Sequence, residues 1–296
     1  MDKLNFDSLL KSGVHFGHLS KKWNPKMSSY IFMKKNGIHI IDLNKTILKM
    51  QEASAAIKQI VKSGKKILFV ATKKQAKSII EENISSLGMP YVVERWPGGM
   101  LTNFITIRKA VKKMNNIDTM FSDGTANTLS KKERLFIQRE RQKLEKNFGS
   151  ISDLKRLPQA IFIVDVNREN IAVKEAKKIR IPIFGIVDTN SDPSDIDFPI
   201  PGNDDSRHSI ELIVKYIASS IKEGLEEYEL NKKSKKENNS DKVSEKNNDK
   251  KDIKEEKSMK EEKSMKEEKS MKEEKSKKDT KSKKDTKSKK STKDKK

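Results

Sequence analysis

The sequence predicts an α/β fold in which helices cover both faces of a parallel sheet, with a projecting helical hairpin and a disordered tail. Short continuous apolar runs, which are typical of strands buried on both faces, alternate with amphipathic helical segments over most of the chain. One stretch in the middle replaces this alternation with two successive helical patterns. The end of the chain is lysine-rich and has no apolar stripe.

The first half of the chain contains the signals for a hairpin and then for strand–helix alternation. Apolar runs flank Asn36-Gly37, a pair that favours a tight β-hairpin. A helix follows over 42–64, which we predict to be capped by Asn44 and ended by Gly64. The run KKILFVA then predicts a buried strand, TKKQAKSIIEENISSLG a helix and MPYVVE a second strand.

The same alternation returns after residue 159. The segments AIFIVDV and IPIFGIVD predict buried strands on either side of the helix NRENIAVKEAKKIR. A short strand, DFPI, and a long amphipathic helix that begins near Asp205 complete the series. Because parallel strands need crossover connections, this order predicts a parallel sheet with helices on both faces.

Residues 101–154 interrupt this order and predict two antiparallel helices that pack as a coiled coil. Apolar residues recur there every three or four positions and form one narrow seam, namely Phe104, Ile107, Val111, Met114, Ile117 and Phe121. After a break, Ser130 and Glu133 have the spacing of a capping box at the start of a highly charged second helix. A protruding charged hairpin favours a partner larger than a metabolite.

The composition indicates a polyanionic partner. The 296 residues include 65 Lys and Arg against 43 Asp and Glu, a formal net charge of +22, and cations that neutralise phosphates release condensed counterions. Residues 231–296 hold 27 lysines and 16 acidic residues in repeats such as EEKSMK, so we expect a disordered tail there. The chain has no cysteine and no long apolar run, and we expect a soluble, cytoplasmic protein with no membrane segment.

Histidines near the N-terminus raise the alternative of a metal or catalytic site. His15 and His18, together with His39, carry rings that bind metals or act as bases. The stretch VHFGHLS contains a glycine and is not clearly helical, and no cysteine is available as a further ligand. We therefore expect these histidines to pack or hydrogen-bond within the fold, and we predict no metal.

A second alternative lies at the carboxyl ends of the parallel strands, where sheets of this type bind ligands. Asp165 and Asp188 end two predicted strands, and further aspartates follow, namely Asp192, Asp195, Asp204 and Asp205. Such a group is compatible with a magnesium-dependent phosphoryl-transfer or hydrolytic enzyme that uses Asp165 and Asp188. No predicted strand leads into a glycine-rich phosphate loop, so this activity is the weaker alternative, and we expect no catalytic residues and no cofactor.

Cations beside aromatic residues favour a third interpretation, which is RNA binding. Lys21 and Lys22 precede Trp23, and Arg95 precedes Trp96 just before PGGMLTN. Lysine and arginine contact phosphates, whereas tryptophan stacks on an unpaired base. Each tryptophan would equally well fix its loop to the core, so the pattern alone leaves both roles open.

Several segments resemble the S-two family of small ribosomal subunit proteins in its bacterial form. They are GVHFGH, WNPKM followed by YIF, NGIHIIDL, KKILFVATKKQA, RWPGGMLTN, and the stretch from PQAIFIVDVNREN to IPGNDD. The resemblance covers about residues 5–225 in order. It implies a flavodoxin-like α/β domain over 1–100 and 155–230, a coiled-coil hairpin over 101–154, and a structural role without enzymatic activity.

The resemblance also implies partners and binding residues. Proteins similar to this one bind 16S rRNA between the head and body of the small subunit, beside neighbouring ribosomal proteins. They join late in assembly and in many bacteria help to hold the messenger-binding protein of that subunit. Carried over to this chain, the expected RNA-binding residues are Lys21, Lys22, Trp23, Asn24, Lys26, Arg95, Trp96, Asn103, Arg108, Lys109, Lys112 and Lys113.

Overall fold

The computed structural model describes residues 5–232, apart from the side chain of Asn127. The chain divides into two units, Met1–Leu230 and Asn231–Lys296. The predicted tail lies outside the described residues, except for Asn231 and Lys232, which continue the last helix.

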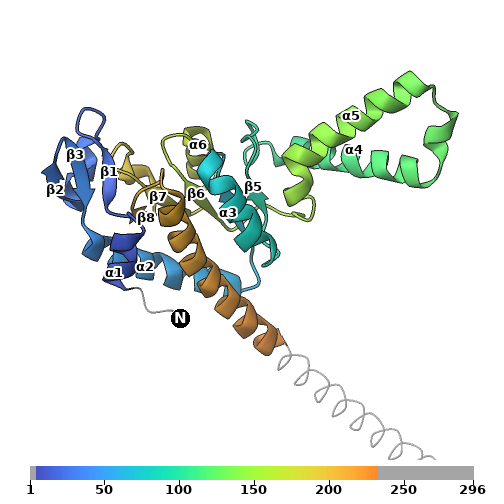
Figure 1. The fold of residues 1–296 in the computed structure, drawn as a ribbon. Coiled ribbons are helices and arrows are strands. Elements are labelled where there is room, and N and C mark those ends of the chain that lie inside the picture. Colours follow the sequence, from blue (N-terminus) through green and yellow to red (C-terminus); the bar gives the residue numbers. More distant parts are fainter. Residues whose placement is uncertain (1–4, 233–296) are drawn as a thin grey trace, which may run out of the picture. The chain divides into compact units, whose positions relative to one another are not determined.

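The first unit alternates helices and strands along most of its length (Figure 1). Its helices are α1 (Phe6–Lys11), α2 (Leu43–Lys62), α3 (Lys74–Ser85), α4 (Phe104–Ser122), α5 (Lys131–Phe148), α6 (Asn170–Lys178) and a final helix over 207–232. Its strands are β1 (Phe16–Leu19), β2 (Ile31–Lys35), β3 (Ile38–Ile41), β4 (Ile67–Val70), β5 (Tyr91–Val92), β6 (Ala160–Val164), β7 (Ile183–Val187) and β8 (Phe198–Pro201).

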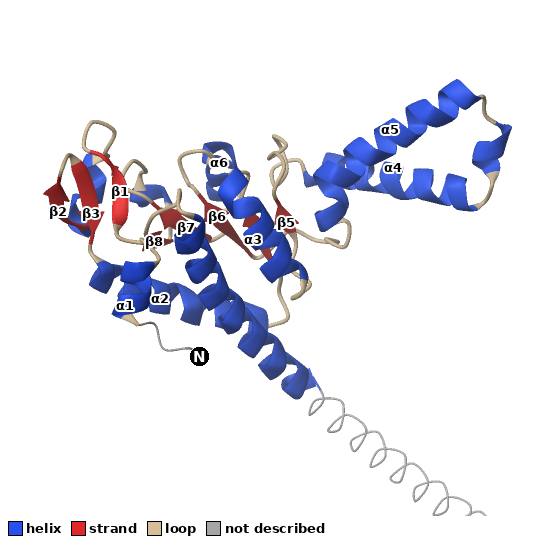
Figure 2. Ribbon diagram, in the orientation of Figure 1, coloured by secondary structure: helices blue, strands red, loops and turns tan. Residues whose placement is uncertain are grey.

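Five strands form the parallel sheet, in the order β5-β4-β6-β7-β8 (Figure 2). Numbered along the chain within this sheet, the order is 2-1-3-4-5, which is that of flavodoxin-like sheets. The predicted α/β fold is therefore confirmed. The register pairs Phe69 with Phe162 and Phe162 with Phe184, so that three fully buried phenylalanines lie in a row across the centre of the sheet.

Alternate residues of each strand supply two separate cores, because successive side chains point to opposite faces. The phenylalanine row belongs to the core that includes α2, α3 and the final helix. The other core includes Leu68 and Ile163 of the sheet, together with α6 and the segment before α4. Helices cover both faces of the sheet. Burying one such apolar side chain contributes about 1.5–3 kcal/mol, so these contacts hold the helices against the sheet.

A smaller antiparallel sheet, in the order β1-β3-β2, carries the N-terminal segment. Asn36 and Gly37 connect β2 to β3 with φ angles of 51° and 79°, the left-handed conformation that a two-residue hairpin turn requires. The predicted hairpin is confirmed.

The boundaries of α2 differ from the prediction at one end. Its N-cap is Asp42, whose carboxylate accepts a hydrogen bond from the Asn44 amide at 3.0 Å. The predicted cap at Asn44 is wrong, because Asp42 has the same short acceptor side chain and precedes the helix by one residue. At the other end Gly64 stands just past the helix with a φ of 75°, as predicted.

The hairpin consists of α4 and α5, which run alongside one another away from the parallel sheet (Figure 1). Four seam residues of α4 are buried, namely Ile107, Val111, Met114 and Ile117. Ser130 and Glu133 form the predicted capping box of α5, a helix with no buried residue. Lys113 of α4 pairs with Glu140 of α5, and Asp118 pairs with Arg141. The two predicted helices are confirmed, and their supercoiling as a coiled coil remains a prediction.

No helix in the described part of the chain combines the length and the apolarity that crossing a membrane requires.

Candidate nucleic-acid interface

The N-terminal segment is fixed against the loop that follows β7. The His18 amide donates to the Thr189 hydroxyl at 2.8 Å, and the Asn24 amide donates to the Thr189 carbonyl at 2.7 Å. Gly17 lies so close to Thr189 that a Cβ there would stand 2.5 Å from the threonine methyl group. A glycine is therefore required at this position, and the loop fixes the segment at its two ends, His18 and Asn24.

The five candidate residues in this segment differ in how they are held. Lys21 and Lys22 are exposed, and within the described residues neither has an ion pair or a hydrogen-bonded side chain. Trp23 is 36% exposed and its ring lies 5.0 Å from that of His39. Asn24 caps the next turn by accepting from the Lys26 amide, and the Lys26 ammonium pairs with Asp192 at 2.7 Å. The two free lysines and the partly exposed indole remain available for a partner.

The loop before α4 is organised by one buried carboxylate, that of Glu175 on α6. Its Oε1 accepts from the Gly99 amide at 2.7 Å and from the indole of Trp96 at 3.2 Å. Its Oε2 accepts from the amides of Leu101 and Thr102 at 3.0 and 3.1 Å, and from the Thr102 hydroxyl at 3.2 Å. Burial by itself raises the pKa of Glu175, but these hydrogen bonds outweigh it and leave the pKa below its usual value.

Trp96 is therefore not available for base stacking. Its side chain is 6% exposed, it belongs to the core beneath the loop, and its one donor is used by Glu175. That Trp96 contacts RNA stays a prediction, and what its burial supports is a structural role in which the indole fixes the loop that carries Arg95. Arg95 itself is exposed and has no side-chain partner within the described residues.

The candidates on α4 line its exposed side. Asn103 is the N-cap residue of α4 and accepts from the Thr106 hydroxyl at 2.9 Å. The Arg108 guanidinium donates to the Leu154 carbonyl at 3.1 Å, which ties the hairpin to its return segment. Lys109 and Lys112 are exposed and unpaired within the described residues, whereas Lys113 pairs with Glu140.

The structure thus divides the candidates into two groups rather than one surface. The residues over 21–26 lie beside the three-stranded sheet, and those over 95–113 lie on the hairpin and at its base. Figure 1 shows these two parts at opposite ends of the first unit. A single partner that contacts both groups must span the body, which a folded RNA can do and a metabolite cannot.

A cluster of charged side chains occupies the carboxyl edge of the parallel sheet, as predicted for Asp165 and Asp188. His18 forms a bridge there, with its Nδ1 2.9 Å from Asp188 and its Nε2 3.3 Å from Asp205. The hydrogen bond with Asp188 raises the pKa of His18 against the opposing effect of burial. The prediction that this histidine is bound within the fold is confirmed.

Lys73, the residue just before α3, neutralises the same cluster. Its ammonium lies 3.1 Å from Asp165 and 2.7 Å from both Asp204 and Asp205. Its pKa is raised well above the usual range because the three carboxylates outweigh the effect of burial. Burial, followed by repulsion from Asp165 and Asp188, raises the pKa of Asp204 to about 7. The sequence did not predict a role for Lys73, because its partner Asp204 lies 131 positions away in the chain and no local pattern connects the two.

This arrangement is built for mutual neutralisation rather than for acid–base or nucleophilic chemistry. Each carboxylate named above is paired with a lysine or a histidine, and no serine or threonine nucleophile forms a dyad with His18 in the described residues. His18, Asp188, Asp204 and Asp205 offer ligand atoms within 4.8 Å of one another, and the buried Asp204 Oδ2 has no hydrogen-bond partner. These four residues are the set that could hold a divalent cation.

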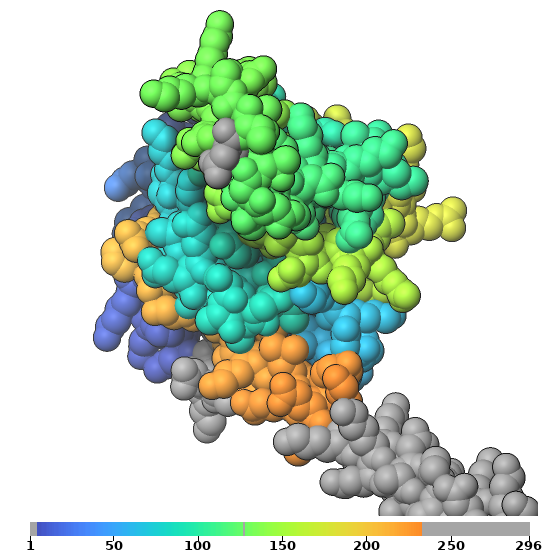
Figure 3. Space-filling model, turned by 90° about the vertical axis from the view of Figure 1, so that its right-hand side faces the viewer, coloured from blue at the N-terminus to red at the C-terminus, as the bar shows by residue number. Residues whose placement is uncertain are grey.

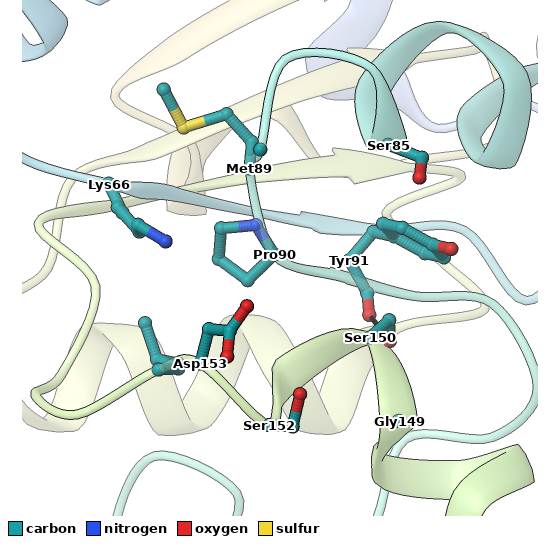
Figure 4. Close-up of a pocket in the computed structure, with 11 residues that line it drawn as sticks. Lys66, Ser85, Met89, Pro90, Tyr91, Gly149, Ser150, Ser152 and Asp153 are labelled. Atoms are coloured by element: carbon teal, nitrogen blue, oxygen red, sulfur yellow. Dashed lines mark hydrogen bonds between the residues drawn. The ribbon is translucent and has the colours of Figure 1, made fainter.

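A separate pocket of about 300 Å³ lies at the opposite, amino-terminal edge of the sheet (Figure 4). Lys66 and Asp153 enter it from two sides of Pro90, and the Ser150 hydroxyl beneath it is bonded to the Tyr91 carbonyl. Open α/β sheets bind ligands outside their carboxyl ends. This pocket lies at the other end of the sheet, and one lysine with one aspartate does not define a class of ligand.

The fold and its site define an α/β scaffold that exposes free cations at two places and neutralises its own carboxylates. Comparison with known proteins identifies the family to which this scaffold belongs. Residues 9–224 match the model of the family described as ribosomal protein S2, and the chain belongs to that family. The family is one of structural ribosomal proteins, so the alternative of a phosphoryl-transfer or hydrolytic enzyme that uses Asp165 and Asp188 is wrong.

The curated relatives agree with the family match. A protein of Phocaeicola vulgatus named small ribosomal subunit protein uS2 is 62% identical over 232 residues, which are 78% of this chain and 83% of the relative. The protein of that name from Azobacteroides pseudotrichonymphae is 64% identical over 227 residues, 77% of this chain and 87% of its own. A third, from Christiangramia forsetii, is 62% identical over 226 residues, 76% of either chain.

Proposed function

We propose that this protein is a structural constituent of the small ribosomal subunit that binds 16S rRNA between head and body and supports late assembly and translation initiation. The observation that carries the proposal is the family match over residues 9–224, which covers the parallel sheet, the N-terminal sheet and the hairpin. The free cations at two separated places support it, because sequence-independent affinity for RNA comes largely from phosphate contacts.

The exposure and pairing of the candidate side chains support a ranking of the proposed RNA-binding residues. Exposed cations without an internal partner are the stronger members, namely Lys21, Lys22, Arg95, Lys109 and Lys112. Trp23 adds a partly exposed ring. The remaining candidates already have partners within the fold, so their contacts with RNA would compete with those bonds. They are Asn24, Lys26, Asn103, Arg108 and Lys113.

The proposal extends to protein partners and to location. Neighbouring proteins of the small subunit would contact this chain, and the messenger-binding protein of that subunit is a further partner. We place the protein on ribosomes in the cytoplasm.

Sedimentation of a cell lysate through a sucrose gradient tests the proposal directly. The protein should migrate with small subunits and with 70S particles at low and at moderate salt. A pool that sediments only as free protein would reject the ribosomal assignment.

Substitutions test which cations carry the affinity. Arg95→Ala and the double change Lys21→Ala/Lys22→Ala should weaken incorporation into small subunits and reduce the salt dependence, by roughly 0.7–0.9 in the log–log slope for each phosphate that is no longer neutralised. Lys215→Ala is the control, because Lys215 pairs with Glu211 on the final helix. An unchanged slope in both test variants would remove these residues from the interface.

A further inference from the structure

The outer face of α5 carries a stripe of residues that the assigned interface does not use. Lys132, Phe136, Arg139 and Lys143 follow one another at spacings of four, three and four residues, which places them on one side of the helix. All four are exposed, and Phe136 is 70% exposed. What marks Phe136 is its position in the middle of a row of cations, where one side chain offers a ring and its neighbours offer positive charge.

The cations of this stripe are free, whereas the acidic residues of α5 are all engaged. Glu133 belongs to the capping box, Glu140 pairs with Lys113, and Glu145 pairs with Arg141. Lys132, Arg139 and Lys143 have no ion pair or side-chain hydrogen bond within the described residues. The outer face of the helix therefore presents positive charge that the protein does not neutralise.

The first half of the stripe is hollowed. Lys132, Phe136 and Arg139 line one shallow pocket there, and its other lining residues are Leu129, Ser130, Glu133, Leu135 and Ile137. The carboxylate of Glu133 is held by the capping box. Figure 3 looks onto this end of the molecule and shows the green atoms of the hairpin standing in front of the body. The pocket lies on the projecting element, where a large partner can reach it.

We propose that this face of α5 binds an unpaired nucleotide of RNA, with its base stacked on Phe136 and its neighbouring phosphates held by Lys132, Arg139 and Lys143. Stacking suits any base, because every base has a π-face, and the flanking cations supply the phosphate contacts. From Lys132 to Lys143 the helix rises about 16 Å, enough to reach backbone on both sides of one base. A protein partner fits less well, because three of the four residues in the stripe are charged and the cores of protein–protein interfaces are depleted of charged residues. The inference rests on the proposed ribosomal function and adds a second RNA contact on the hairpin.

The test measures binding of the full chain to small subunits stripped of their own copy of this protein, at several salt concentrations. Phe136→Ala should weaken binding roughly tenfold without changing the salt slope, and Phe136→Trp should restore it. The triple change Lys132→Gln/Arg139→Gln/Lys143→Gln should lower the log–log salt slope by about 2. Leu48→Ala on α2 is the matched control, since Leu48 is 55% exposed and lies outside both the pocket and the proposed RNA-binding residues.

The outcomes separate this inference from the function on which it rests. If the wild-type chain does not bind the stripped subunits, both fail. If it binds and Phe136→Ala binds equally well, the α5 site is overturned while the ribosomal function stands. If Phe136→Ala weakens binding but leaves every RNA nucleotide protected from chemical probes as in the wild type, the face meets a protein and the inference is again overturned. Circular dichroism verifies that the helices of each variant are intact.

Discussion

The loop over 95–103 and the helix α5 both present cations, but they hold their charged residues in opposite ways. The loop is fixed to the body by Glu175, whose carboxylate accepts hydrogen bonds from three backbone amides, a hydroxyl and an indole. Helix α5 has no buried residue, and its acidic side chains pair only at the surface. This loop is therefore fixed through a buried charge, whereas the outer face of α5 is left free for a partner.

The difference has a physical consequence for stability. Hydrogen bonds to a buried charged group are strong, and removing one side leaves the others unsatisfied in the core. Exposed ion pairs such as those of α5 contribute about 0–1 kcal/mol each. We therefore expect removal of a buried acceptor in the body to change folding, and substitutions of exposed, unpaired side chains to change binding alone.

The largest effect is expected from removing the carboxylate of Glu175. Glu175→Ala leaves the amides of Gly99, Leu101 and Thr102 without their acceptor, and should lower the free energy of unfolding by about 3 kcal/mol or more. Urea unfolding followed by circular dichroism measures this loss. Because the loop is released, incorporation into small subunits should fall as well.

Glu82→Ala is the matched control for this experiment, since Glu82 is an exposed glutamate on α3. Its effect should stay within about 0.5 kcal/mol. Equal losses in the two variants would break the comparison, because they would show that the loop does not depend on its buried acceptor.

The role of Glu175 also marks the limit of what could be predicted from the sequence. The alternation of apolar runs and helical segments predicts the sheet, and Asp165 and Asp188 lie at its carboxyl edge as expected. By contrast, Arg95-Trp96 has the same local pattern as Lys22-Trp23, yet one tryptophan is buried and the other is partly exposed. What decides between them is a glutamate 79 residues away, which no local pattern contains.

The same limit applies to the charged cluster. The sequence predicts the aspartates as strand ends and turns, and it predicts that His18 is bound within the fold. It does not predict that Lys73 neutralises the aspartates, because the lysine lies between β4 and α3 and contacts Asp204 only when the sheet has formed. Long-range pairs of this kind follow from the topology rather than from neighbouring residues.

A pH-dependent effect of intermediate size is expected from Asp204. Its pKa is raised to about 7, first by burial and then by Asp165 and Asp188. The folded state therefore holds a proton that an unfolded aspartate releases near pH 4, so this group's contribution to stability is lost as the pH rises from about 4 to about 7. Asp204→Asn removes the ionisation, and relative to the wild type it should be more stable at pH 8 than at pH 5, by about 2 kcal/mol.

Urea titrations at both pH values measure this difference in stability. EDTA is present because the cluster offers ligands for a cation. Asp123→Asn, on the exposed end of the hairpin, is the control variant for the same titrations. If the stability of Asp204→Asn relative to the wild type is the same at pH 5 and pH 8, Asp204 is ionised in the fold at both values, and the buried cluster behaves like the surface pairs of α5.

The smallest effect is expected from the region with the highest proportion of charged residues. In residues 231–296 the six-residue repeat turns Met259, Met265 and Met271 to different sides of any helix, so they form no stripe that could pack. Deleting Asn231–Lys296 should leave the thermal midpoint unchanged within about 2 °C, because stability scales with buried apolar area and paired buried charge. Scanning calorimetry of the shortened chain measures it. A fall of several degrees would mean that the lysine-rich segment packs on the body, and that charge without an apolar face contributes to this fold after all.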